Sequence, residues 1–173
     1  LTSVTFGENI KSIGEYAFEI CNSLTSVELP DSLRSIEMGA FERCSSLTSV
    51  TIGEGVKNLG SLTFHHCYAL RELVIPESIE SMGSECFDCH PKLITLTIPI
   101  SFNATNGGHP WLYSEKIENV TFTPGDGIGD NYSIGLRPPW VDSKNSLTTV
   151  IFKEGIAHIG EYTLYGCKNV TSI

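Results

Sequence analysis

The sequence predicts a β-rich solenoid, a fold in which one short unit is repeated and its copies stack on one another. Three observations predict it. An apolar residue, usually leucine, recurs every 23 residues; two more apolar positions follow it three and five residues later; and most units then carry an Ala-Phe pair and a cysteine or close equivalents. A fixed period of about 20 to 50 residues is typical of units that bury their apolar face only by stacking on neighbours.

Each unit begins with a predicted β-strand. We call each unit a rung and each set of equivalent positions a column. The leading column contains Leu1, Leu24, Leu47, Leu70 and Leu93, and it resumes with Leu147 and Val170. After Leu24, Val27 and Leu29 alternate with the polar Ser26 and Glu28, and this period of two is that of a strand with one buried face. Equivalent residues of stacked strands are expected about 4.8 Å apart.

Two further segments follow the strand in each rung. Pro30 ends the strand because proline lacks the donor that a central strand needs, and Leu33 and Ile36 form a second short inward segment. The Ala-Phe-x-x-Cys piece at 40–44 is interpreted as a single helical turn, because its phenylalanine and cysteine then lie on one face. Each rung therefore has three sides.

The full repeat is L-x-x-V-x-[IL]-P-x-x-[VIL]-x-x-I-G-x-x-A-F-x-x-C-x-x-L, which resembles the BspA-like, or Treponema-type, leucine-rich repeat. Five units carry it closely, namely 1–23, 24–46, 47–69, 70–92 and the unit from Leu147. The resemblance implies a single leucine-rich-repeat solenoid domain over 1–173, with about seven rungs of 23 residues, short helical turns and a right-handed superhelix.

The pattern is irregular over 99–146. Glycine and proline are dense there and predict loops at 103–116 and 123–146, although Val120 and Phe122 restore a strand between them. We treat this stretch as irregular rungs. Leu1 begins on a strand position and Ile173 stops inside a unit, so the chain is expected to be an excerpt of a longer protein.

Composition and charge restrict the possible functions. The chain has 173 residues, of which 40% are hydrophobic and 18% charged, as in soluble proteins. Its net charge of −9 argues against nucleic acid, whose affinity for proteins comes largely from Lys and Arg on phosphate. No apolar run approaches the length of a membrane span. Glu80 interrupts a basic column that includes Lys57, so we expect Glu77 and Glu80 to form a more anionic spot.

The sequence Cys86-Phe87-Asp88-Cys89-His90 matches C-x-x-C-H, a pattern of haem attachment, and contains the C-x-x-C of redox and zinc sites. However, Cys86 occupies the Ala column, and Cys89 falls one residue short of the Cys column, where His90 stands. We keep a metal or thiol redox site around Cys67, Cys86, Cys89 and His90 as an alternative hypothesis.

Rung stacking also brings His65, His66 and Cys67 beside Cys89 and His90, and the thiols and imidazoles of two adjacent rungs would supply zinc with sulfur and nitrogen ligands. The Cys column is expected to point inward and these histidines outward, so buried free thiols with surface histidines are the favoured interpretation. Cys21 and Cys44 are likewise expected to remain thiols, because equivalent side chains point in parallel.

No set of residues predicts catalysis. The chain lacks G-x-S-x-G, a phosphate-binding loop and H-E-x-x-H, so we predict that it is not an enzyme and expect no cofactor. Trp111, Trp140 and Tyr113 could stack on a sugar ring, although aromatic side chains that fill the core are the favoured explanation.

The outward residues of the predicted strands form the candidate binding face, because repeat proteins bind partners on such extended surfaces. They are Ser26, Glu28, Ser49, Thr51, Glu72, Val74, Thr95, Thr97, Asn119 and Thr121. Glu72 and Val74, followed by Thr95, break the run of short hydroxyls and are the first place to test. The irregular loops are the second candidate.

The resemblance to BspA-like proteins implies a cell-surface or secreted protein of a host-associated microbe. Its implied function is adhesion to host matrix proteins, host cells or other bacteria, without enzymatic activity. We expect a monomer. The alternative is a structural solenoid that spaces another domain from the cell envelope.

Overall fold

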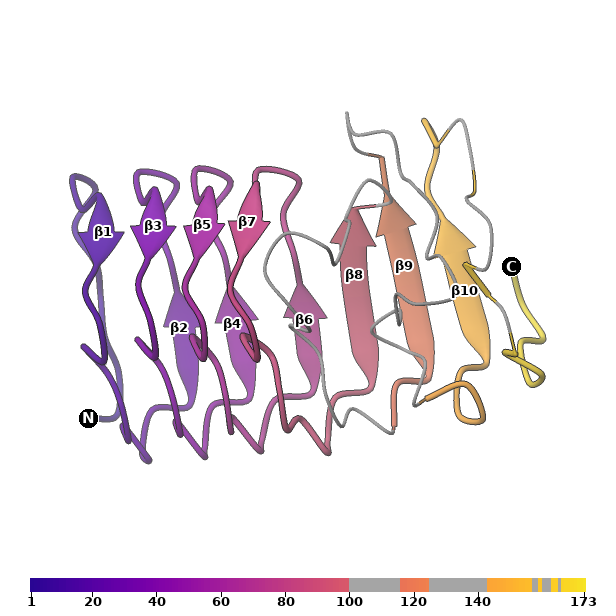
Figure 1. The fold of residues 1–173 in the computed structure, drawn as a ribbon, viewed down its shortest axis with the longest axis horizontal. Coiled ribbons are helices and arrows are strands. Elements are labelled where there is room, and N and C mark those ends of the chain that lie inside the picture. The colour runs from indigo at the N-terminus through magenta and orange to yellow at the C-terminus, as the bar shows by residue number, and fades with distance from the viewer. Residues whose placement is uncertain (100–115, 125–142, 157–158, 160–162, 165) are drawn as a thin grey trace.

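The computed structural model describes residues 1–99, 116–124, 143–156, 159, 163–164 and 166–173. These residues wind as an elongated β-solenoid whose two termini lie at opposite ends (Figure 1). All strands pair in parallel, in two sheets that form two sides of the rod. The predicted solenoid of stacked parallel strands is confirmed.

The larger sheet has six strands in the order β10-β9-β8-β6-β4-β2. Their bounds are β2 (Ser26–Glu28), β4 (Ser49–Thr51), β6 (Glu72–Val74), β8 (Thr95–Pro99), β9 (Asn119–Thr123) and β10 (Thr149–Phe152). Ser26 pairs with Ser49, Ser49 with Glu72 and Glu72 with Thr95, each 23 residues apart. The period of the sequence is therefore the register of the sheet.

The smaller sheet forms the second side of each rung. It contains β1 (Ser12–Ile13), β3 (Ser35–Ile36), β5 (Asn58–Leu59) and β7 (Ser81–Met82), in that order. In each of these strands the second residue is buried. The second inward segment predicted from Ile36 and its equivalents is thus a short strand.

The third side, which we call the turn side, consists of turns, and the predicted helical turn is wrong. Phe18 N donates to Ala40 O at 2.8 Å, and Ile20 N donates to Glu42 O at 2.8 Å, so both bonds reach the next rung. In an α-helix these amides would instead bond to carbonyls four residues earlier in the same segment. The described residues contain no helix.

Backbone dihedrals explain why a helix cannot form there. Two columns of the turn side have positive φ in four successive rungs. The first column is Tyr16, Gly39, Leu62 and Glu85 at 55° to 61°, and the second is Ile20, Arg43, His66 and Cys89 at 58° to 63°. A left-handed residue cannot continue a right-handed helix, and a non-glycine residue in this region costs about 1–2 kcal/mol. Hydrogen bonds between rungs compensate for this cost.

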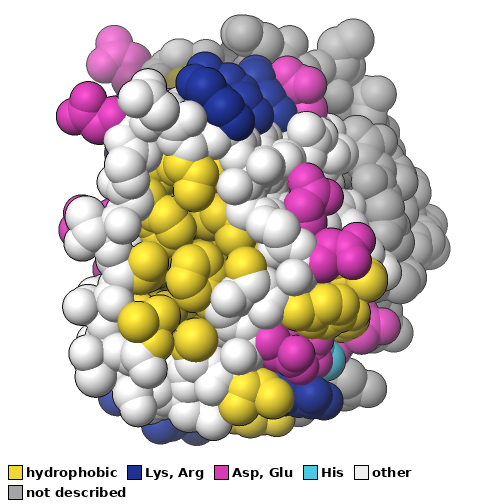
Figure 2. Space-filling view, turned by 90° about the vertical axis from the view of Figure 1, so that its left-hand side faces the viewer, with side chains coloured by type: hydrophobic (Ala, Val, Ile, Leu, Met, Phe, Trp, Pro, Cys, Tyr) yellow, Lys and Arg dark blue, Asp and Glu magenta, His cyan; other side chains and the backbone are white. Residues whose placement is uncertain are grey.

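The core runs through the middle of the rod as columns of equivalent side chains. The rings of Phe18, Phe41, Phe64 and Phe87 stack nearly parallel, with successive centroids 5.0, 5.4 and 5.4 Å apart. The leading leucines from Leu24 onward are fully buried. Figure 2 looks onto the N-terminal end and shows hydrophobic side chains gathered in its middle, with polar groups around them.

The predicted seven rungs are not found. The described residues form about four complete turns, each with one strand in the smaller sheet. In the part of the chain after β8 that the structure describes, only the larger sheet continues, through β9, β10 and a bridge between Thr149 and Ser172. The sequence departs from the repeat after Pro99, where the residues of the second and third sides are replaced. The right-handed winding and the irregular rungs at 99–146 remain predictions.

Candidate functional site

The ten predicted binding residues lie on the outer face of the larger sheet. Ladder pairing places them in two rows: Ser26, Ser49, Glu72, Thr95 and Asn119 in one, and Glu28, Thr51, Val74, Thr97 and Thr121 in the other. The side chains of the first three strands are exposed, and those of β8 and β9 are half-buried. The predicted face therefore exists as one continuous surface, whereas its binding role remains a prediction.

Apolar side chains interrupt this polar face at two points of the same row. Val74 is 43% exposed and Ile151 is 48% exposed. They stand in register with Thr97 and Thr121, which lie between them. These two side chains are the apolar points of a row that is otherwise polar.

A hollow of about 500 Å³ opens at the N-terminal end of the face. Ser26, Glu28 and Thr51 line it, and so do Phe6 and Pro30. The sequence identified the three polar residues by strand alternation. It did not identify the two apolar ones, because they belong to inward or turn columns.

A second candidate group of side chains lies on the turn side. His65 shares a column with Glu42 and Asp88. Its Nδ1 lies 3.6 Å from Glu42 Oε1, and its Nε2 lies 3.6 Å from Asp88 Oδ2. The three side chains are only 12%, 8% and 7% exposed. A largely buried imidazole is thus held between carboxylates of the two adjacent rungs.

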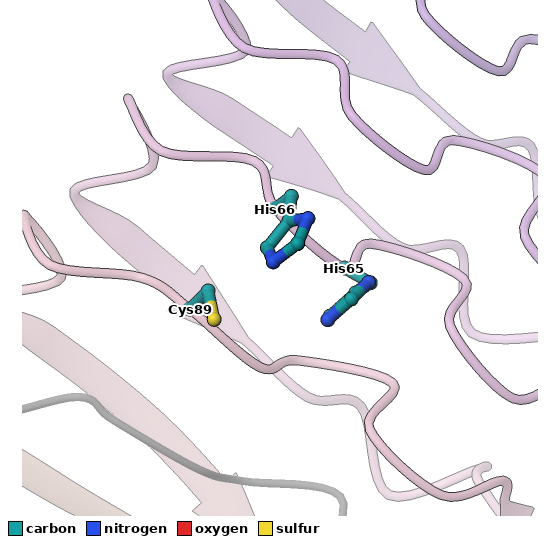
Figure 3. Close-up of side chains that lie close together, drawn as sticks. All are labelled: His65, His66 and Cys89. Atoms are coloured by element: carbon teal, nitrogen blue, oxygen red, sulfur yellow. The ribbon is translucent and has the colours of Figure 1, made fainter.

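His66 and Cys89 occupy the neighbouring column, one rung apart. The His66 ring stacks on the His65 ring with 3.7 Å between centroids. The potential ligand atoms of His65, His66 and Cys89 all lie within 4.8 Å of one another (Figure 3), and those of His65, Glu85 and Asp88 do the same. We call His65, His66, Glu85, Asp88 and Cys89 the His65 cluster.

Burial and charge set the protonation states in this cluster. Burial lowers the pKa of His66, and the nearby His65 and Arg43 lower it further. Burial raises the pKa of the Cys89 thiol to about 11, and the carboxylates of Asp88 and Glu85 contribute. At neutral pH Cys89 is a thiol rather than a thiolate, which argues against a reactive redox cysteine.

The structure separates the residues of the alternative metal or redox site, with Cys89 on the outside of the turn side and Cys67, Cys86 and His90 in the interior. Cys67 is buried and its Sγ donates to Phe41 O at 3.3 Å, while His90 is buried with its Nδ1 3.1 Å from Cys67 O. Cys86 is also fully buried. Cys67, Cys86 and His90 belong to neither group of potential metal ligands among the described residues. The prediction that these three join Cys89 in one site is therefore wrong.

Cys89 differs from these three buried residues because its side chain points outward. It stands one residue before the Cys column, and this offset places it in the outward column of His66. The sequence contained the signal, because the expected cysteine position is occupied by His90. All six cysteines are free. Trp111, Trp140, Tyr113 and most of the two predicted loops lie outside the described residues.

The sequence profile of the BspA-type leucine-rich-repeat region matches residues 1–108 and 142–173, in six copies. The chain belongs to the BspA-type leucine-rich-repeat family. This match covers the regular rungs and the repeat at the C-terminal end, as predicted from the repeat pattern. No curated protein matches the chain. The described residues contain no helix with the length and apolar character that a bilayer span requires.

Solved structures of bacterial leucine-rich-repeat proteins have the same fold. The Treponema pallidum leucine-rich-repeat protein TpLRR is 24% identical over 93% of this chain and 72% of its own, with a TM-score of 0.65. The pneumococcal vaccine antigen PcpA is 18% identical over 86% of this chain and 35% of its own, with a TM-score of 0.65.

A leucine-rich cell surface protein from Faecalibacterium prausnitzii is 22% identical over 86% of this chain and 31% of its own, with a TM-score of 0.55. This chain therefore spans about a third of the Faecalibacterium protein and of PcpA. At these identities the likeness establishes the fold.

Proposed function

We propose that this chain is a non-enzymatic protein-binding module of a cell-surface or secreted protein, and that it binds through the outer face of its larger sheet. The observation that carries the proposal is the continuous double row of outward residues on β2, β4, β6, β8 and β9. Because the ladder holds these strands in register, the backbone of the face needs no ordering on binding.

The solved relatives support a surface location. One is described as a cell surface protein and another as a vaccine antigen. Both share this fold. Host matrix proteins, host cell-surface proteins or other bacteria are the partners that we propose for this chain.

Binding is expected to centre on β6. Glu72 and Val74 point outward from this strand, and both are exposed. Their combination of a carboxylate and an apolar side chain suits a partner surface with a basic group beside a hydrophobic patch. The net charge of −9 also favours a basic partner through long-range attraction.

The test measures binding of the purified protein to immobilised matrix and mucosal glycoproteins. A double variant, Glu72→Lys with Val74→Asp, should weaken retention at least about tenfold, because hot-spot residues typically contribute more than about 1 kcal/mol. Glu15→Lys repeats the charge reversal of Glu72→Lys on the turn side, where Glu15 is exposed, and should leave binding unchanged.

Equal binding by the two variants would contradict the proposed face. Equal binding by a protein that lacks the two rungs 47–92, and with them β6, would support the alternative, a spacer that carries no binding surface of its own. Absence of retention on every ligand tested would count against the adhesion function itself.

A further inference from the structure

We propose that the turn side carries a transition-metal site for Zn²⁺ or a similar ion, with His65, His66 and Cys89 as ligands and Asp88 at the fourth position. Nothing in the family match or in the solved relatives assigns a metal to this fold. The proposal is independent of what the sheet face binds, because the His65 cluster lies on another side of the rod.

The distances suit such an ion once the stacked rings of His65 and His66 turn so that one nitrogen of each faces the same point. Zinc binds nitrogen at about 2.0 Å and sulfur at about 2.3 Å in a tetrahedron, so its ligand atoms lie about 3.3 to 3.7 Å apart. The atoms of His65, His66 and Cys89 already lie within 4.8 Å of one another, and His65 Nε2 lies 3.6 Å from Asp88 Oδ2. Figure 3 shows the two histidines on one rung and Cys89 on the next.

The surroundings of His65 resemble the outer shell of a metal site. Its Nδ1 is buried without a hydrogen-bond partner, and Glu42 Oε1 is 3.6 Å away. If Nε2 binds the metal, Nδ1 carries the proton and can donate it to Glu42 after a small movement. A carboxylate that accepts from a metal-bound histidine fixes the ring and raises its basicity.

Asp88 is also held in place. Its Oδ1 accepts from Cys89 N at 2.6 Å, which leaves Oδ2 directed at His65. Glu85 Oε2 lies 3.9 Å from the same His65 Nε2. The carboxylates of Glu42, Glu85 and Asp88 surround the histidines, with Arg43 as the nearby cation. A divalent cation would relieve the repulsion within this acidic group.

The ligand types identify the class of metal. Imidazole and thiolate ligands favour zinc, copper and related ions, whereas calcium and magnesium require oxygen ligands. The one thiolate, two imidazoles and one carboxylate are each a ligand type that zinc binds. Binding converts the Cys89 thiol to a thiolate and releases its proton to solvent, so no oxidant or reductant is needed.

The experiment titrates Zn²⁺ into metal-free protein by calorimetry and Co²⁺ by absorption spectroscopy. We expect one ion per chain, tetrahedral cobalt bands and a sulfur-to-cobalt charge-transfer band. The ligand variants are His66→Gly and Cys89→Gly. Glycine removes each ligand and also suits the positive φ of 60° and 63° at these two positions.

Each glycine variant should lose more than the 10- to 100-fold in zinc affinity that the loss of an outer-shell partner typically costs. Cys89→Gly should also lose the charge-transfer band. Cys167→Ser is the matched control, because Cys167 is a half-buried free thiol far along the rod, and it should bind zinc as the wild type does.

Thermal unfolding with chelator present shows whether each variant is folded. A folded glycine variant that binds zinc as tightly as the wild type would overturn the proposal. So would a wild-type protein that binds no stoichiometric zinc, or a loss of binding that is equally large in Cys167→Ser.

Discussion

Two pairs of rungs have the same backbone conformation on the turn side but carry different outward side chains. In the first pair, Ile20 and Arg43 occupy the left-handed outer column; in the second pair, His66 and Cys89 occupy it, with φ between 58° and 63° in all four. The phenylalanines beside them stack nearly parallel in both pairs, with centroids 5.0 Å apart in the first pair and 5.4 Å apart in the second. Stacking therefore fixes the backbone and the inner columns, whereas the outer columns can change from rung to rung.

The largest expected effect tests the inner columns. Phe64→Ala should destabilise the protein by about 3–5 kcal/mol, because it removes a fully buried ring from the middle of the stack. Tyr68→Ala is the matched outer change, at a side chain that is 44% exposed, and should cost far less. Denaturant unfolding measures both, and equal losses would contradict the division into inner and outer columns.

The next largest effect is a pH dependence of stability at His90, which stands where other rungs have a cysteine. Burial lowers the pKa of His90 from 6.5 to about 4, partly offset by the hydrogen bond to Cys67 O, and His65 and His66 lower it further. The folded pKa is below the unfolded one, so protonation favours unfolding. The contribution of neutral His90 to the free energy of unfolding is fully present above pH 6.5. It is lost as the pH decreases toward 4, by about 3 kcal/mol in total.

His90→Cys restores the residue found at this column in Cys44 and Cys67, and it should remove that part of the pH dependence. Unfolding free energies at pH 7.5 and pH 4, with chelator present, measure the difference between the two proteins. If wild type and His90→Cys lose stability equally between these pH values, His90 is not the titrating group.

A smaller effect tests the left-handed columns. Ile20→Gly should stabilise the protein by about 1 kcal/mol, because an exposed β-branched residue there has a φ of 58°. Gly39→Ala should have the opposite effect, since φ is 61° and a Cβ would meet the Tyr16 ring. Thermal unfolding compares the two, and changes of the same sign would show that backbone strain does not decide stability here.

The smallest effect concerns the outer charges. Lys57 Nζ lies 2.8 Å from Glu80 Oε1 in the next rung, with side chains 43% and 68% exposed. Glu80 is thus paired, contrary to the expected anionic spot. A double-mutant cycle with Lys57→Met and Glu80→Gln should give a coupling below about 1 kcal/mol that decreases with added salt. A coupling of several kcal/mol would mean that this surface pair helps to fix the register.

The fold could be predicted because stacking makes neighbours of residues 23 apart. Val27 and Leu29 alternate with polar residues, and the structure places them inside β2 and directly after it. The turn side could not be predicted, because Ala-Phe-x-x-Cys has the spacing of a helical turn. Its true geometry depends on hydrogen bonds to the next rung, and seven of the eight left-handed residues are not glycine.

The candidate sites show the same division. Strand alternation identified the sheet face, because the side chains of a strand have only two possible directions. The His65 cluster could not be predicted in the same way, because the sequence does not show which way the Cys89 side chain points. That direction follows from the position of Cys89 one residue before the Cys column. Rung stacking predicted Cys67 and His90 as well as His65 and His66 beside Cys89, and among the described residues the structure groups Cys89 with His65 and His66.

The central claim is that residues 23 apart in sequence are neighbours in space along one rod. Nuclear Overhauser contacts between ring protons in phenylalanine-labelled protein test it most directly, with single Phe→Leu variants for assignment. The account predicts contacts from Phe18 to Phe41, from Phe41 to Phe64 and from Phe64 to Phe87, and none from Phe18 to Phe64. Missing contacts between successive rings, or contacts that skip a rung, would contradict it.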